Sequence, residues 1–289
     1  MSGIYWIASY PKSGNTWVRM VLRSLEQGGA PVRFDDDNAP WWDPSHRSRI
    51  GGISSSRFFF EDVLDIESSD LTEDEIETLR SAAILAWAES AGKPPIVKTH
   101  DAWLSSRGTP LFPPESTKGA VVIVRDPRDV AVSFANHSGI SIDAAIARMA
   151  DPDCRLARTS KKMGSQLAQW LPTWSGHVAG WLDAPVRRLL MRYEDMKADT
   201  PGVMAKIAAF LEFDTTSETV NKAVDAARFD RLQAEEVRSG FRERPAVSSR
   251  FFRRGVAGGW RDTLSRQQAE RIEADHGAMM RRLGYETTT

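Results

Sequence analysis

The first 25 residues constrain the fold most, because they combine an apolar strand, a tight turn and a helix. Residues 4–10 (IYWIASY) form a short apolar run typical of a strand buried on both faces of a parallel sheet. Residues 11–15 (PKSGN) supply turn-forming residues, and residues 16–25 carry apolar side chains at helical spacing. The pattern predicts a strand, a turn and a helix in direct succession.

The same alternation continues along the chain. Further strands are predicted at 95–99, 120–124 and 186–192, and helices at 70–91, 130–136, 201–211, 216–227 and 265–283. Thr72 with Glu75 and Ser265 with Gln268 have capping-box spacing. Residues 28–60 lack clear periodicity and are expected to be irregular. The sequence predicts an α/β fold with a central, mainly parallel sheet flanked by helices, with residues 1–289 forming a single domain.

Composition excludes several classes of protein. Thirty-eight basic against 39 acidic residues give a net charge of -1, which argues against binding nucleic acid or a membrane through bulk charge. A single cysteine, Cys154, excludes a disulfide framework and suits a reducing compartment. No apolar run is long enough to span a bilayer, and the N-terminus lacks the basic region of a secretory signal. We therefore expect a cytoplasmic protein.

The turn after the first strand, Tyr10 to Trp17 (YPKSGNTW), has the composition of a phosphate cradle. A glycine-containing turn before a helix offers backbone N–H groups and the positive end of the helix dipole to an anion. Lys12 adds a cation, and Ser13, Asn15 and Thr16 add side-chain donors. Lys12 precedes Gly14, whereas the lysine of an NTP-binding P-loop follows its second glycine. The pattern favours phosphate binding over the alternative, an ordinary strand-to-helix turn.

Three other segments carry candidate functional residues. Arg125, in RDPRDVAVS, ends the clearest strand, where open α/β sheets bind ligands, and Ser133 follows it on the next helix. The segment FFRRGVAGGW (251–260) lies in a cluster of seven arginines and one glutamate between 238 and 261. His100, in KTH, follows a strand and is a candidate general base. Taken singly, a surface ion pair, a flexible basic loop and a structural histidine explain these segments as well. The other four histidines are expected to be structural.

Taken together and in this order, the four segments resemble the sulfotransferases of the cytosolic type that depend on 3′-phosphoadenosine 5′-phosphosulfate (PAPS). The resemblance extends from Trp6 to about Glu270. It implies a fold related to P-loop nucleotide kinases and an in-line transfer of the sulfuryl group to a hydroxyl or amine of a small-molecule acceptor. The product nucleotide would be adenosine 3′,5′-bisphosphate (PAP), and no metal is expected.

The resemblance also implies roles for individual residues. His100 would take the proton from the acceptor, Lys12 would contact the bridging oxygen, and Lys98 would lie beside the transferring group. The remaining residues implied in nucleotide binding are Ser13, Gly14, Asn15, Thr16, Trp17, Arg125, Ser133, Tyr193, Phe229, Phe252, Arg253, Arg254 and Gly255. Core packing is the alternative for any one of the aromatic residues. WSGHVAGW (174–181) is interpreted as structural.

Several positions depart from the family pattern. Asn15 replaces a threonine or serine, Arg254 replaces a lysine, and Gly259 stands where the family has an aspartate. The family's dimer motif survives only as Arg261, Ser265, Arg266 and Glu270, so a homodimer is left open. Residues 31–60 and 137–165 would be expected to line the acceptor pocket, and phenol, alcohol, sugar, amine and natural-product acceptors all stay open. The alternative functions are an ATP-dependent small-molecule kinase and a non-catalytic nucleotide-binding protein.

Overall fold

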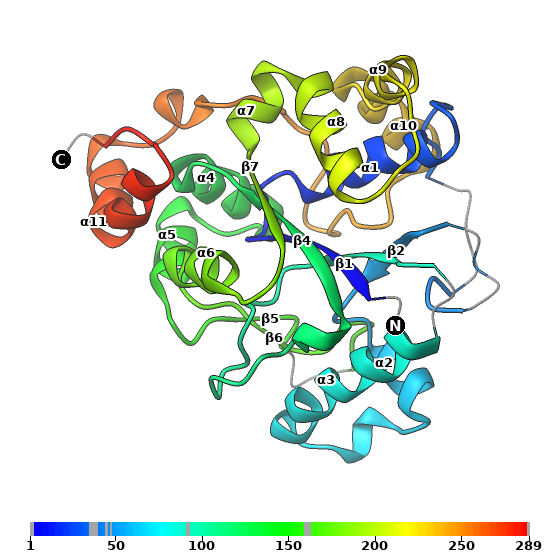
Figure 1. Cartoon of the computed structure of the whole chain (residues 1–289). Helices are drawn as coiled ribbons and strands as arrows, with labels where there is room; N and C mark the ends of the chain where they lie inside the picture. The colour runs from blue at the N-terminus through cyan, green and yellow to red at the C-terminus, as the bar shows by residue number, and fades with distance from the viewer. Residues whose placement is uncertain are drawn as a thin grey trace. The chain divides into compact units, whose positions relative to one another are not determined.

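The computed structural model describes residues 3–34, 40–43, 46, 48–90, 93–158 and 163–287 (Figure 1). The chain forms two compact units, and each is assembled from segments that are separate in sequence. The first comprises Met1–Tyr10, Ala39–Val122 and Asp151–Leu190; the second comprises Pro11–Asn38, Ile123–Ala150 and Met191–Thr289.

A five-stranded sheet has the order β2-β3-β1-β4-β7. Its strands are β1 (Ile4–Ser9), β2 (Ile50–Ile53), β3 (Ile96–Thr99), β4 (Thr117–Val124) and β7 (Arg188–Arg192). β1 pairs with β3 in parallel, with Tyr5 opposite Ile96 and Ala8 opposite Thr99, and β2 also pairs with β3 in parallel. Every residue of β1 is buried, which explains why its sequence is continuously apolar instead of alternating.

The core of the first unit contains a cluster of large aromatic rings. The Phe112 ring lies 4.6 Å from that of Trp6 and 5.1 Å from that of Trp181, which in turn lies 5.4 Å from Trp103. All four side chains are at most 2 % exposed. The indole N–H of Trp6 donates to Thr117 Oγ1 at 3.1 Å, so its one polar group is satisfied within the core.

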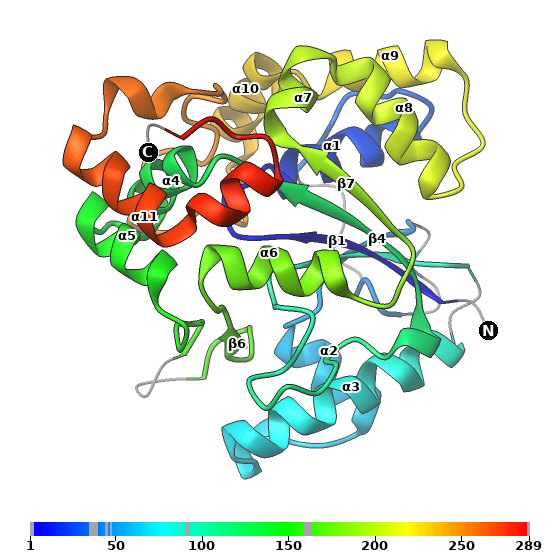
Figure 2. The same cartoon turned by 60° about the vertical axis from the view of Figure 1, so that its left-hand side comes forward.

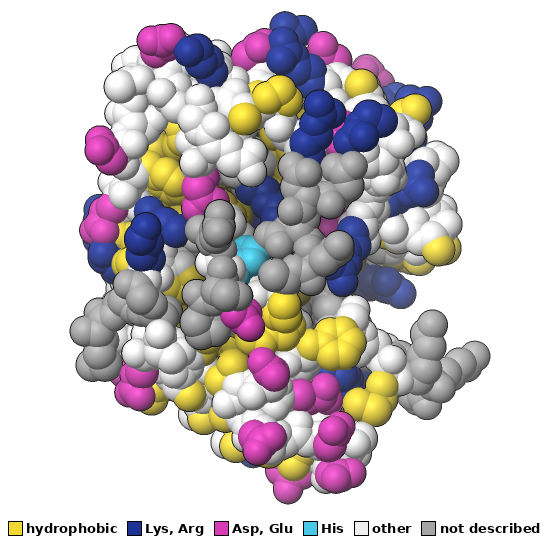
Figure 3. All heavy atoms as spheres, turned by 90° about the vertical axis from the view of Figure 1, so that its right-hand side faces the viewer, with side chains coloured by type: hydrophobic (Ala, Val, Ile, Leu, Met, Phe, Trp, Pro, Cys, Tyr) yellow, Lys and Arg dark blue, Asp and Glu magenta, His cyan; other side chains and the backbone are white. Residues whose placement is uncertain are grey.

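Helices and short strands complete the first unit. They are α2 (Arg57–Leu64), η1 (Ser68–Asp70), α3 (Glu73–Ser90), η2 (Pro114–Ser116), β5 (Arg155–Leu156), β6 (Gln169–Trp170) and α6 (Trp174–Asp183). α2 and α3 pack side by side (Figure 1). Acidic and hydrophobic side chains gather on the surface of this part of the unit (Figure 3). There an open pocket is lined by Pro40, Trp42, Phe58, Glu61, Asp62, Asp65, Ile66 and Glu67.

The second unit is largely helical. Its helices are α1 (Asn15–Glu26), α4 (Pro127–Ser138), α5 (Ile142–Ala150), α7 (Tyr193–Ala198), α8 (Thr200–Phe210), α9 (Ser217–Ala226), α10 (Phe229–Ser239), η3 (Gly259–Asp262) and α11 (Arg266–Arg282). α9 packs against α1 and α8, while α11 packs against α4 and α5 (Figure 2).

Buried ion pairs join α4 to α11. Arg128 Nη2 lies 2.7 Å from Asp126 Oδ2, and its Nη1 lies 2.7 Å from Glu273 Oε1. The same guanidinium donates to the carbonyl of Glu286 at 2.9 Å. A buried arginine paired in this way is costly to disrupt, because removal of one partner leaves an uncompensated charge.

The predicted α/β class with a central parallel sheet is confirmed. Both capping boxes also form: Thr72 and Glu75 exchange hydrogen bonds, and so do Ser265 and Gln268. The expectation of an irregular stretch over residues 28–60 is wrong in part, because it contains β2 and the start of α2. β2 has only four residues and forms by pairing with β3, which periodicity within its own sequence does not show.

Candidate functional site

The loop between β1 and α1 has the backbone geometry of an anion-binding turn. Lys12 and Gly14 both adopt positive φ angles, 69° and 106°. Gly14 is the N-cap of α1 and has no side chain, so the first N–H groups of the helix lack a side-chain cap. The loop therefore offers backbone donors and the positive end of the helix dipole to a negatively charged group.

Glycine is required at position 14 for two reasons. Its φ of 106° is one that side chains rarely adopt, and a Cβ there would lie 2.8 Å from Cδ2 of Tyr193. Lys12 adopts a left-handed conformation without being glycine, at a cost on the order of 1–2 kcal/mol. Strain of this kind is concentrated at ligand-binding loops.

Two buried polar atoms show that this loop is suited to a ligand. Ser13 is fully buried, and its Oγ has no hydrogen-bond partner among the residues that the structure describes. The same holds, within the described ranges, for Nε of Arg125. Buried donors are almost always paired, so orphaned donors beside an anion-binding turn fit a bound phosphate or sulfate group.

The ammonium group of Lys12 has defined neighbours. Nζ lies 3.3 Å from Nδ1 of His137 and 4.3 Å from the centroid of the Phe251 ring. Because an ammonium only donates, Nδ1 of His137 is the acceptor. Phe251 supplies a cation–π contact to the same group. His137, expected to be structural, therefore lies at the candidate site.

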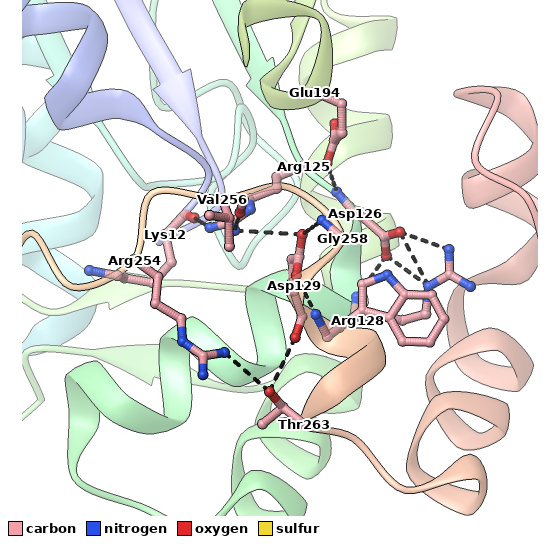
Figure 4. Close-up of polar contacts among 12 residues, drawn as sticks. Lys12, Arg125, Asp126, Arg128, Asp129, Glu194, Arg254, Val256, Gly258 and Thr263 are labelled. Atoms are coloured by element: carbon pink, nitrogen blue, oxygen red, sulfur yellow. Dashed lines mark hydrogen bonds and ion pairs between the residues drawn. The ribbon is translucent and has the colours of Figure 1, made fainter. Parts of the chain in front are cut away.

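Arg125 connects this loop to residues 251–260 (FFRRGVAGGW), the glycine-rich segment (Figure 4). Its guanidinium donates to the carbonyl of Lys12 at 3.2 Å and to that of Val256 at 2.8 Å. It also lies 3.6 Å from the carboxylate of Asp129 and 4.3 Å from the centroid of the Tyr193 ring. The arginine is thus positioned at the junction of two predicted ligand-binding segments.

Asp129, in the first turn of α4, fixes the glycine-rich segment. Its Oδ2 accepts the N–H of Gly258 at 2.7 Å, and its Oδ1 accepts that of Trp260 at 2.9 Å (Figure 4). The carboxylate is only 3 % exposed. The aspartate that the family pattern places at position 259 is absent, and this buried carboxylate from another helix holds the backbone on both sides of Gly259.

Arg253 and Arg254 give this segment a positive charge. Both side chains are exposed, and the Nη1 of Arg254 lies 3.5 Å from Oγ1 of Thr263. Partial burial lowers the pKa of Arg253, and the charges of Arg254 and Arg125 lower it further. Repulsion among three arginines indicates a surface suited to an anion.

Aromatic side chains adjoin both segments. Trp17 donates its indole N–H to the carbonyl of Ala227 at 3.1 Å, and its ring centroid lies 6.0 Å from that of Tyr193. Gly255, at a φ of 62°, lies so close to Phe229 that a Cβ would be 2.4 Å from the ring. Phe252 is buried and stacks in an aromatic cluster with Phe34, which favours a packing role for it.

Thr16 differs in its surroundings from the other loop residues. Its hydroxyl donates to Oε2 of Glu243 at 3.2 Å, and the same carboxylate pairs with Arg19 at 2.7 Å. A carboxylate in this position is stabilised by the positive end of the α1 dipole. Ser133 lies half-buried in α4, after the turn that carries Asp129.

The residues predicted to perform catalysis belong to the first unit, apart from Lys12. Lys98 is half-buried in β3, and its carbonyl accepts the N–H of Ser54 at 2.9 Å. His100 follows this strand, and its Nδ1 lies 2.8 Å from the carbonyl oxygen of Ser9. Because a carbonyl only accepts, Nδ1 carries the proton and the lone pair of the neutral ring is on Nε2.

The family model described as the sulfotransferase domain matches residues 4–284. The chain belongs to this family. Among curated relatives, Sulfotransferase 1 family member D1 of Rattus norvegicus is 26% identical over 280 residues, covering 93% of this chain and 81% of the relative. Cytosolic sulfotransferase 17 of Arabidopsis thaliana is 26% identical over 285 residues, covering 93% and 72%. The prediction that the protein is an enzyme of the sulfotransferase class is confirmed.

Solved structures agree on the fold of the sulfotransferase. A mouse sulfotransferase complexed with PAP has a TM-score of 0.59 at 20% identity, covering 97% of this chain and 85% of that one. Retinol dehydratase in complex with androsterone and inactive cofactor PAP has a TM-score of 0.58 at 19% identity, covering 99% and 81%. The expected α/β fold with a central parallel sheet is therefore shared with these solved structures.

The second unit of the sulfotransferase thus brings together residues from most of the predicted nucleotide-binding segments. Arg125 contacts the Lys12 loop and the glycine-rich segment, and Tyr193 contacts both Arg125 and Trp17. Three side chains at the site had no individual role predicted from the sequence: Asp129, His137 and Phe251. Each lies in a segment with predicted function, RDPRDVAVS, 137–165 and FFRRGVAGGW respectively, but the contacts that these side chains make are with residues distant in the sequence.

The aromatic residues of the 31–60 segment, which was expected to line the acceptor pocket, differ in their surroundings. Phe59 and Phe60 are buried, and the Trp41 ring stacks on Phe59 at 5.0 Å. Phe58 is 57% exposed and lines the open acidic pocket with Trp42. Parts of the two predicted acceptor segments, at 35–39, 44–45, 47 and 159–162, lie outside the described residues.

The described residues contain no group of three or more His, Cys, Asp or Glu side chains arranged to hold a metal ion. No helix in them is both long and apolar enough to cross a bilayer.

Proposed function

We propose that this sulfotransferase transfers the sulfuryl group of PAPS to a hydroxyl or amine of a small-molecule acceptor, with His100 as the general base. The observation that carries the proposal is the fully buried Ser13 hydroxyl, which has no partner among the described residues and lies in a left-handed turn at the start of α1. This arrangement fits a 5′-phosphosulfate. The mouse sulfotransferase and retinol dehydratase are both complexed with PAP, which is consistent with this assignment.

The residues that would hold the nucleotide divide into two groups. Ser13, Gly14 and the first N–H groups of α1 would bind the 5′-phosphosulfate, with Lys12 supplying the cation. Arg125, Arg253 and Arg254 would bind the 3′-phosphate, since arginine is suited to bidentate recognition of phosphate. When bound, PAPS supplies a sulfuryl group on a phosphate leaving group, so that the bond from sulfur to the acceptor forms as the bond from sulfur to the bridging phosphate oxygen breaks, and PAP departs.

The side chains of the protein would contribute a proton transfer and the stabilisation of negative charge. Nε2 of His100 carries the lone pair and would accept the proton of the acceptor hydroxyl or amine. Lys12 and Lys98 would stabilise negative charge on the departing phosphate oxygen, as preorganised cations do in phosphoryl transfer. The predicted cytoplasmic location is supported by the relatives named cytosolic, and the homodimer stays a prediction.

Calorimetric titration tests the nucleotide assignment. The titrants are PAP, AMP and ATP, and the proteins are wild type, Arg125→Ala and Arg266→Ala. Arg266 is 92% exposed on α11 and controls for the loss of one positive charge. We expect tight binding of PAP that needs its 3′-phosphate and falls at least tenfold in Arg125→Ala alone. A preference for ATP would overturn the proposal in favour of a kinase.

Turnover of radiolabelled PAPS tests whether His100 is the general base. The probe acceptors are a naphthol, an aliphatic alcohol and an alkyl amine. We expect His100→Ala to lower kcat by on the order of 10²–10⁴ while PAP affinity stays within twofold of wild type. Near-full activity in this variant would contradict the role of His100. PAP binding without any turnover of the wild type on a wider acceptor panel would favour a non-catalytic nucleotide-binding protein.

A further inference from the structure

α6 holds the backbone at the end of β3, where His100 lies. The Nε2–H of His177 donates to the carbonyl of His100 at 3.1 Å, and the indole N–H of Trp181 donates to the carbonyl of Asp101 at 3.0 Å. His177 and Trp181 are four residues apart on the helix and therefore on one face of it. Two consecutive carbonyls are thus held by two side chains of one helix.

The residue after His100 is fixed from a second direction. Asp101 is 1 % exposed, and its carboxylate receives both Nη1 and Nη2 of Arg80, at 2.8 and 2.6 Å. The hydroxyl of Ser54 also donates to this carboxylate, at 3.1 Å. The bidentate pair fixes the orientation of the side chain, while the two donors from α6 fix the peptide planes.

This backbone determines where the imidazole of His100 lies. Its Nδ1–H reaches the carbonyl of Ser9 at 2.8 Å, a contact that fixes the tautomer with its lone pair on Nε2. The contact requires the Cα of His100 to stay in place relative to β1. Rotation of the peptide between His100 and Asp101 would move the ring away from the Ser9 carbonyl, and a single tautomer would then no longer be favoured.

His177 is a constant donor near neutral pH. It is 1 % exposed, and burial lowers its pKa to about 4, so its ring is neutral. Its ring also meets the Tyr10 ring edge to face, with centroids 5.6 Å apart. Since the His100 carbonyl accepts, the proton of His177 is on Nε2.

We propose that His177 and Trp181 are positioning residues, which hold the His100 backbone so that its imidazole presents Nε2 to the acceptor. The proposal rests on the proposed function of His100 as the base. It assigns to His177 and Trp181, in the segment WSGHVAGW, a positioning role beyond the structural role expected from the sequence.

The test compares variants that remove or retain each donor. His177→Leu removes the donor, His177→Gln retains an N–H at a similar position, and Trp181→Phe removes the indole N–H but keeps a ring. Trp174→Phe is the matched control, because Trp174 is fully buried on the same helix and its indole nitrogen donates to neither carbonyl. His276→Leu controls for the loss of another buried imidazole.

Two measurements are made on each variant. Nitrogen NMR of labelled imidazoles reports the tautomer of His100, and the protein has only five histidines to assign. Turnover of radiolabelled PAPS with the naphthol, alcohol and amine probes gives kcat, while calorimetry gives PAP affinity. We expect His177→Leu and Trp181→Phe to lose the single His100 tautomer and about tenfold in kcat, with PAP affinity within twofold of wild type.

Rescue by His177→Gln distinguishes a loss of His100 positioning from a loss of protein stability. His177→Gln should recover most of the lost kcat and the His100 tautomer, and both control variants should match wild type. Wild-type kcat and tautomer in His177→Leu and Trp181→Phe would overturn the proposal. If His177→Leu does not fold, the proposal is tested by comparing kcat and the His100 tautomer of Trp181→Phe with those of Trp174→Phe. Should wild type lack sulfuryl transfer or His100→Ala retain it, the proposed function fails, and the NMR result still decides whether α6 positions the ring.

Discussion

A buried hydroxyl with no partner among the described residues is unusual at the scale of single residues, because such groups are costly to bury. Ser13 lies fully buried in this way within a turn that also places Lys12 and Gly14 in left-handed conformations. Folding alone gains nothing from this hydroxyl. A serine whose hydroxyl serves only a ligand therefore allows binding to be separated from folding by one substitution.

Ser13→Ala should weaken PAP binding about tenfold or more without lowering the free energy of unfolding. The first effect follows because a hydrogen bond to a charged group contributes roughly 1.5–3 kcal/mol, and the second because the Ser13 hydroxyl makes no hydrogen bond to any of the described residues. Calorimetry and urea unfolding measure the two quantities. Ser24→Ala is the matched control, since its fully buried hydroxyl donates to the carbonyl of Ala30 at 2.5 Å.

Ser24→Ala should show the reverse pattern, with stability lowered by about 1 kcal/mol and PAP affinity unchanged. Unchanged PAP affinity in Ser13→Ala would mean that its hydroxyl does not bind the nucleotide.

At the scale of elements, the glycine-rich segment after Phe252 depends on partners from two helices. Asp129 of α4 accepts the N–H groups of Gly258 and Trp260, and the backbone of Gly255 lies against the ring of Phe229, the first residue of α10. The segment has few side chains of its own with which to fix its shape. Its conformation is therefore imposed by residues distant in the sequence.

Gly255→Ala should weaken PAP binding, whereas Gly28→Ala should not. Both glycines have left-handed φ angles, 62° and 70°, so each alanine should cost about 1–2 kcal/mol of stability. At Gly255 the added Cβ would collide with a ring, 2.4 Å from Phe229, while no atom of the described residues lies within 4 Å of a Cβ at Gly28. Thermal unfolding and PAP titration of both variants test this, and equal PAP affinities would show that the close approach to Phe229 is irrelevant to the site.

At the scale of the whole molecule, each unit contains a buried neutral histidine. Burial lowers the pKa of His177 in the first unit and of His276 in the second to about 4 each. In the unfolded chain both would titrate near 6.5. Between these values the unfolded state binds more protons than the folded state, so stability is fully present above 6.5 and is lost as the pH falls towards 4.

Lowering the pH from 7.5 to 5 should therefore reduce the free energy of unfolding by about 2 kcal/mol for each histidine. Burial also raises the pKa of Glu194, which offsets part of this loss. Urea unfolding across this range measures how steeply the free energy of unfolding falls with pH, and His276→Gln should make this dependence weaker. An unfolding free energy that does not change between these pH values would contradict the buried, neutral state of both imidazoles.

Much of the fold could be predicted from local sequence. The apolar runs of β1 and β4, with β3 predicted as a short strand between helices, indicated a parallel sheet, and the capping boxes marked two helices. β2 could not be predicted, because it is short and depends on β3 for its pairing. The candidate nucleotide-binding segments were recognisable from charged residues directly after β1 and β4, and from arginine and glycine together in residues 251–260.

The order of these segments, the chemical character of each and the family to which the chain belongs follow from the amino-acid sequence without the structure. Only the tertiary structure decided that Asp129 holds the glycine-rich turn, that His137 and Phe251 adjoin Lys12, and that α6 holds the backbone at His100. The physical reason is that strand and turn propensities act between neighbours in the chain. Hydrogen-bond partners such as Asp129 and Gly258 are separated by 129 residues and are chosen by packing.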